Sequence, residues 1–152
     1  CALVPVFSTR EEAVESALDL IEKDSLAYEA VEVGIKYKNE TATNLHEYYG
    51  DMSPVHSLNN LAVVVWAFLS FQDSFDEAIG ETICCGWDTD CTGATVGGLL
   101  GLDMGAIPES WTSPWQGRVQ TAIAGVGELD LDSLVKRTCT LVDRFSSLAD
   151  LG

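Results

Sequence analysis

Two carboxylates, Asp88 and Asp90, lie two residues apart just before a stretch with the composition of a helix. Carboxylate oxygens are ligands that hard divalent cations such as Mg²⁺ prefer, and the positive end of a helix dipole favours negative charge at the same place. The pair is therefore a candidate metal site. The spacing also fits ordinary capping, in which one aspartate accepts backbone amide protons and the other is solvated. Spacing alone leaves both interpretations open.

Established loop motifs do not fit this segment. Asp88 and Asp90 match the first two ligand positions of an EF-hand loop, but its last position, which must be a bidentate glutamate, is Leu99. The glycines that follow lie within the expected helix, no strand precedes them, and no lysine stands where a P-loop needs one. There is also no Gly-x-Ser-x-Gly elbow. Calcium-loop, phosphate-loop and triad chemistry are therefore unsupported.

The charge of the chain is strongly acidic and uneven. The 24 Asp and Glu residues against 8 Lys and Arg give a formal net charge of −16, which repels phosphate backbones and anionic membrane surfaces. Nucleic acid and membrane are therefore not expected as partners. No Lys or Arg lies between Lys38 and Arg118, so a ligand of this stretch is expected to be, or to arrive with, a cation. The alternative is that these acids sit at solvated helix ends.

The cysteines and the apolar runs indicate a cytoplasmic protein. The five cysteines have no CxxC spacing in a chain too long and too apolar for a disulfide-stapled miniprotein, which indicates a reducing compartment. With only His46 and His56 as nitrogen ligands, a zinc site is not favoured. The first seven residues are too short an apolar run for a signal peptide. The longest apolar run, Leu61 to Leu69, is far below the ~20 residues that cross a bilayer.

The elements that must position these residues are helices. Helical spacing and capping residues predict an all-α fold, with one domain over residues 1–152 and helices over 9–23, 25–35, 43–49, 58–71, 74–85, 91–102 and from Asp130 or Asp132 onward. The segment 58–71 is apolar nearly all round, which is typical of the centre of a bundle. The segment 117–127 is ambiguous.

Two of these helices have faces that predict close packing. Gly93, Gly97 and Gly101 recur at intervals of four. Because each glycine costs a helix roughly 1 kcal/mol relative to alanine, we expect a neighbouring helix at short range. In the last helix the apolar spacing predicts a buried stripe of Leu134, Val135, Thr138, Leu141, Val142 and Phe145.

The string GWDTDCTGATVGGLLG at residues 86–101 resembles the second metal-binding motif of the ADP-ribosylglycohydrolase family. His56, Asn60 and Ala62 are similar to the family's helix leading into the motif, and residues 73–78 resemble its acidic helix start. The resemblance covers nearly the whole chain. It implies a compact multi-helix bundle that holds two divalent ions, usually magnesium, with manganese as the alternative. These ions orient an ADP-ribose moiety while water displaces a group from the anomeric carbon.

Carried over residue by residue, the resemblance makes Asp88 and Asp90 metal ligands. The family's further Thr or Ser ligand falls on Cys91, and because a neutral thiol is a poor magnesium ligand, Cys91 is not expected to coordinate. The family also needs an N-terminal Thr-Asp-Asp motif, which nothing before Asp88 matches. We therefore expect this chain to be the C-terminal half of such an enzyme. The catalytic residues are then expected on the other half, supplied by the same protein or by a second chain.

Two residues near the motif are candidates for substrate binding. Trp87 would stack on adenine or ribose, or else be a partly buried core tryptophan. His56 would touch substrate, or else cap a helix or lie in the core. Two functions follow: part of a metal-dependent hydrolase of an ADP-ribosyl N- or O-glycosidic bond, or a family member that has lost hydrolysis and acts as a binding or structural protein. An upstream Thr-Asp-Asp motif would favour the first.

Overall fold

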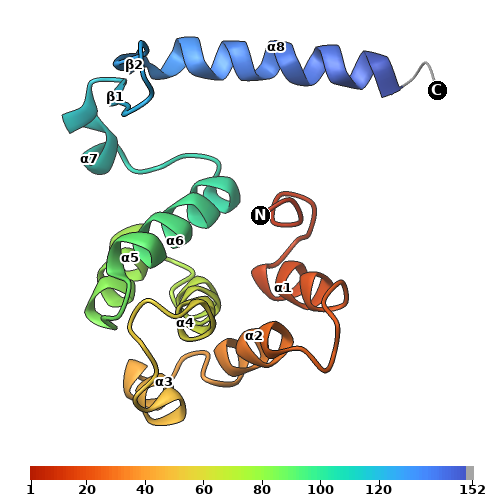
Figure 1. The fold of residues 1–152 in the computed structure, drawn as a ribbon, viewed down its shortest axis with the longest axis vertical. Helices are drawn as coiled ribbons and strands as arrows, with labels where there is room; N and C mark the ends of the chain where they lie inside the picture. The colour runs from red at the N-terminus through yellow and green to blue at the C-terminus, as the bar shows by residue number, and fades with distance from the viewer. Residues whose placement is uncertain (150–152) are drawn as a thin grey trace. The chain divides into compact units, whose positions relative to one another are not determined.

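The computed structural model describes residues 1–149, and their contacts divide the chain into two units, Cys1–Ile107 and the part from Pro108 onward. The first unit contains α1 (Arg10–Leu18), α2 (Leu26–Lys36), α3 (Ala42–Tyr49), α4 (Ser57–Ser70), α5 (Phe75–Cys84) and α6 (Thr89–Met104) (Figure 1). The second contains α7 (Glu109–Thr112), a 3₁₀ turn (Ser113–Trp115), the antiparallel strands β1 (Arg118–Gln120) and β2 (Glu128–Asp130), and α8 (Leu131–Ala149). The predicted all-α class is confirmed. The single domain over 1–152 stays a prediction, since two compact units can belong to one larger domain.

Helix α4 is the centre of the first unit. Its side chains from Ala62 to Leu69 are all buried, and α1, α2, α3, α5 and α6 pack around it (Figure 1). Trp66 is fully buried and its indole Nε1 donates to the backbone oxygen of Glu40 at 3.0 Å, so the one polar atom of this ring is satisfied. A helix without a polar face is stable here because other helices cover every side of it.

Capping residues set the starts of α2 and α5 as predicted. Ser25 accepts from the Tyr28 amide at the start of α2, and Ser74 accepts from the Glu77 amide at the start of α5. The predicted helix over residues 9–23 is wrong at its end, because α1 stops at Leu18. The amides of Leu20 and Ile21 bond to carbonyl oxygens three residues back, which tightens the chain into a turn.

The neighbouring helix predicted for the glycine face of α6 is present at two of the three glycines. A Cβ added at Gly93 would lie 2.8 Å from Cδ1 of Ile83, and one added at Gly97 would lie 3.6 Å from Cδ1 of Ile79, so these two glycines face α5. Gly101 instead faces Ile107, which follows the helix, with 3.4 Å to its Cγ1. The short connection between α5 and α6 ends at Asp88, the N-cap of α6, and Asp90 lies in the first turn of that helix.

A buried arginine joins three parts of the first unit. Arg10 is 4% exposed; its guanidinium donates to the Asp103 carboxylate and to the backbone oxygens of Phe68, Phe71 and Gln72. Charge on a buried guanidinium is tolerated only with such partners. Arg10 therefore ties α1 and α6 to the end of α4.

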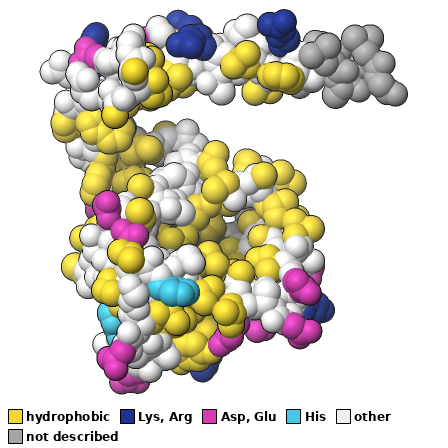
Figure 2. All heavy atoms as spheres, in the orientation of Figure 1, with side chains coloured by type: hydrophobic (Ala, Val, Ile, Leu, Met, Phe, Trp, Pro, Cys, Tyr) yellow, Lys and Arg dark blue, Asp and Glu magenta, His cyan; other side chains and the backbone are white. Residues whose placement is uncertain are grey.

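The predicted buried stripe of α8 is wrong. Val135, Leu141 and Phe145 are 54%, 52% and 66% exposed, and hydrophobic atoms are visible along this helix in Figure 2. Besides α8, the described part of the second unit consists of α7, the 3₁₀ turn and a short hairpin, and β2 of this hairpin contacts α8. This is too little apolar surface to cover the stripe. Over the described residues, no helix combines the length and apolarity needed to span a membrane.

Candidate metal site

Asp88 and Asp90 lie at the start of α6, where the turn from α5 ends. Asp88 occupies the N-cap position and is half-buried, but its side chain makes no capping hydrogen bond. Asp90 is exposed in the first turn, beside the free amides of the helix N-terminus. The Asp88 carboxylate therefore does not cap the helix by a hydrogen bond, and it lies where the helix dipole favours negative charge.

The structure brings a third donor to the two carboxylates. One ligand atom from each of Asp88, Asp90 and Cys91 can be chosen so that all lie within 4.8 Å of one another. Within the described part of the chain, this is the one group of three or more His, Cys, Asp or Glu donors placed in this way. The Asp88 carboxylate beside the Cys91 thiol raises the pKa of that thiol, because it favours the protonated form.

The turn carrying the motif is held by α4. Asn60, which is 9% exposed, accepts from the Asp88 backbone amide through Oδ1 at 3.2 Å. Its Nδ2 donates to the backbone oxygens of Pro54 at 2.7 Å and His56 at 2.8 Å. The Thr92 hydroxyl donates to the Asp88 backbone oxygen at 3.0 Å, so the backbone of Asp88 is fixed on both sides. Asn60 is therefore a positioning residue; the sequence marked it only through the family resemblance.

Trp87 belongs to an aromatic cluster beside the motif. It is half-buried, with its ring centroid 4.1 Å from that of His46 and 6.0 Å from that of Tyr49. His46 Nε2 lies 2.7 Å from the backbone oxygen of Cys85, which fixes the imidazole. The backbone of Trp87 has a φ of 59°, a left-handed conformation that neighbouring contacts must stabilise. The partly buried interpretation of Trp87 is confirmed, and its stacking on a substrate stays a prediction.

His56 caps α4. Its Nδ1 accepts from the Leu58 amide at 3.3 Å, and the imidazole is otherwise exposed. The capping alternative is therefore confirmed, and a contact of His56 with substrate stays a prediction. The backbone oxygen of His56 is also one of the two acceptors that hold Asn60.

The donor set suits a divalent cation but does not complete its shell. Mg²⁺ takes about six oxygen ligands in octahedral geometry, and the chain offers two carboxylates and one thiol here. The carboxylates fit this ion, whereas the thiol suits softer metals. Water, substrate or further protein groups would have to provide the remaining ligands.

Comparison with known proteins identifies the family. The family model described as ADP-ribosylglycohydrolase matches residues 2–146, nearly the whole chain. No curated protein and no solved structure matches it. With an all-α fold and an aspartate pair at the start of α6, this chain belongs to the ADP-ribosylglycohydrolase family.

Proposed function

We propose that this chain takes part in the metal-dependent hydrolysis of an ADP-ribosyl N- or O-glycosidic bond, with Asp88 and Asp90 as metal ligands. The observation that carries the proposal is the cluster of three donor atoms within 4.8 Å at the start of α6. It occurs in a chain that belongs to a family of hydrolases. The half-buried Asp88 carboxylate, which makes no capping bond, supports a role as ligand.

The residues of this chain would bind and orient, rather than transfer protons. Asp88 and Asp90 would hold the cation, and Asn60 and Thr92 fix the backbone from which Asp88 projects. Bound Mg²⁺ or Mn²⁺ would supply the positive field that an acidic chain needs to accept a pyrophosphate and would polarise the reacting groups. The general acid or base, and the other ligands of a two-ion site, would come from an N-terminal half in the same protein or in a second chain.

The proposal predicts that ADP-ribose with Mg²⁺ raises the melting temperature of the intact protein. A ligand that binds only the folded state at a hundred times its dissociation constant adds about 2.7 kcal/mol of stability. The measurement is a thermal melt with ADP-ribose, with Mg²⁺, with both and with neither. An unchanged melting temperature with both would count against the proposal. Stabilisation without release of ADP-ribose from a modified peptide would favour the family member that binds but does not hydrolyse.

The thiol in the cluster predicts an altered metal preference. We expect Cys91→Ser to weaken Cd²⁺ binding about tenfold and to leave Mg²⁺ binding unchanged or tighter, because sulfur suits soft cations and a hydroxyl suits hard ones. Equilibrium titration with each metal measures this. Cys84→Ser is the matched control, since Cys84 is also exposed but lies outside the cluster. Equal Cd²⁺ affinity in both variants would show that Cys91 is not a ligand.

A further inference from the structure

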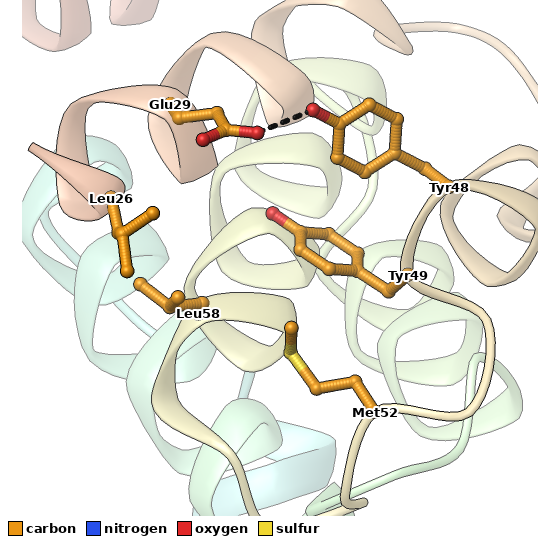
Figure 3. Close-up of a pocket in the computed structure, with 6 residues that line it drawn as sticks. All are labelled: Leu26, Glu29, Tyr48, Tyr49, Met52 and Leu58. Atoms are coloured by element: carbon orange, nitrogen blue, oxygen red, sulfur yellow. Dashed lines mark hydrogen bonds between the residues drawn. The ribbon is translucent and has the colours of Figure 1, made fainter. Parts of the chain in front are cut away.

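A second site lies on the first unit, apart from the aspartates. A pocket of about 300 Å³ opens between α2, α3 and the start of α4 (Figure 3). This volume is at the lower end of small-molecule sites. The lining consists of Leu26, Glu29, Tyr48, Tyr49, Met52 and Leu58. None of these residues is a candidate metal ligand, although Tyr49 also contacts Trp87 beside the motif.

Glu29 is the one charged residue of the lining. Its Oε1 accepts from the Tyr48 hydroxyl at 2.6 Å, which holds the carboxylate in place, and Figure 3 shows its second oxygen turned away from this bond. The hydrogen bond to Glu29 raises the pKa of Tyr48, so this phenol stays a donor. Lys36 Nζ lies 5.9 Å from the Tyr48 ring centroid and does not line the pocket. The lining therefore presents an oriented negative charge with no positive charge of its own.

Tyr49 adds a second polar atom. Its hydroxyl is buried, has no hydrogen-bond partner among the described residues, and points toward Glu29 (Figure 3). Burial raises the pKa of Tyr49 to about 12, so the group stays a neutral hydroxyl that can accept a hydrogen bond. Leu26 and Tyr48 form the rim of the pocket and are 65% and 43% exposed, so a ligand can reach the Glu29 carboxylate from solvent. A group with two N–H donors placed between Glu29 and Tyr49 would donate to the Glu29 carboxylate and to the Tyr49 hydroxyl oxygen.

We propose that this pocket binds the head group of an organic cation, a guanidinium or a primary ammonium. Glu29 supplies the counter-charge and the Tyr49 hydroxyl a second acceptor, while Leu26, Met52 and Leu58 contact the alkyl stem. An anion would be repelled by Glu29 and by the net charge of −16. A wholly apolar ligand would cover the Glu29 carboxylate with the Tyr48 hydroxyl as its only hydrogen-bond donor in the lining, which is costly for a charged group. The pocket therefore selects a cationic head on an apolar stem.

The test is a titration of the full chain with ethylguanidinium in the absence of divalent metal, followed by NMR chemical shifts. Ethylurea, which has nearly the same shape without the charge, is the control ligand. We expect saturable binding of ethylguanidinium and none of ethylurea. Equal binding of the two, or no saturation with ethylguanidinium, would overturn the proposal. Because no metal is present, this failure would leave the proposed hydrolysis untouched.

Variants locate the binding. Glu29→Gln should weaken ethylguanidinium binding at least about tenfold, since it removes the charge-assisted bond, and Tyr49→Phe should weaken it about threefold. Glu32→Gln removes the same charge from an exposed position of the same helix and should have less than about a twofold effect. Equal losses for Glu29→Gln and Glu32→Gln would show only general attraction to an acidic surface. Melting temperatures confirm that each variant is folded.

The cationic group could belong to a side chain of a partner polypeptide or to a free small amine, and further ligands distinguish the two. A blocked peptide containing arginine is compared with the same peptide containing citrulline, its uncharged analogue, and with free agmatine. Tighter binding of the arginine peptide than of agmatine would assign the pocket to a side chain of a partner polypeptide. The reverse order would assign it to a free small amine. In either case the citrulline peptide should not bind.

Discussion

Asp88→Asn is expected to abolish the stabilisation of the intact protein by Mg²⁺ with ADP-ribose and to lower turnover of an ADP-ribosylated substrate at least about 100-fold. The reason is that the variant removes a negative oxygen from the three-donor cluster without changing the shape of the side chain. The melting temperature without ligand should stay nearly unchanged, because the Asp88 side chain makes no capping bond. Thermal melts and a release assay for ADP-ribose measure the two effects, and Asp90→Asn should behave alike.

A charge-matched variant tests whether the effect is local. Asp73→Asn removes the same charge from an exposed position at the start of another helix. It should leave both the ligand-induced shift and the turnover close to those of the parent protein. Full activity in Asp88→Asn, or an equal loss in Asp73→Asn, would contradict metal ligation by the aspartates of the motif.

The second large effect concerns the contact of α2 with α4. Gly34→Ala is expected to destabilise the fold by about 3 kcal/mol, near the upper end of overpacking costs. The added Cβ would lie 2.6 Å from Cβ of Val65 and 2.8 Å from the backbone oxygen of Ala62. Neither atom is the end of a flexible side chain, so the two helices would have to move apart. Denaturation by urea measures the change in the free energy of unfolding.

Gly80→Ala is the matched control for this substitution. Gly80 is also helical, lies in α5 and has open space around it. The same change there should raise stability by about 0.5–1 kcal/mol, because alanine is the better helix former. If Gly34→Ala also proved neutral or stabilising, the close approach of α2 and α4 would be refuted.

Local chemistry made much of the fold predictable from the sequence. Ser25 and Ser74 mark helix starts because their hydroxyls satisfy amides within three residues, which depends only on neighbouring residues. The segment of α4 is apolar nearly all round, so it had to be covered by other helices on every side. This predicted its position at the centre of the bundle. The glycines of α6 indicated a close neighbour, although not which one. The aspartate pair was likewise visible as a candidate site because both ligands lie in one turn.

The rest depended on distant contacts, which periodicity does not contain. Arg10 bonds to Asp103, which is 93 residues away, and nothing near either residue in the sequence marks this pair. The apolar spacing of α8 predicted an amphipathic helix correctly, but spacing does not provide the surface that would cover it. The need for a glycine at position 34 depends on Val65 and Ala62 of α4, which are close in space but about 30 residues away in the chain. The pocket of Glu29 and Tyr49 combines residues from two helices, and no motif marked it.

Through Asn60, helix α4 both forms the centre of the hydrophobic core and positions the candidate metal-binding motif. One amide group on this helix holds both the chain entering it and the backbone amide of Asp88. Substitutions that loosen the hydrophobic interior should therefore misalign the aspartates as well, even when they lie far from any ligand. Selection for correct alignment of Asp88 and Asp90 would then act on interior residues such as Trp66 and Phe68. Tolerance to mutation should therefore be lowest among the buried residues around α4.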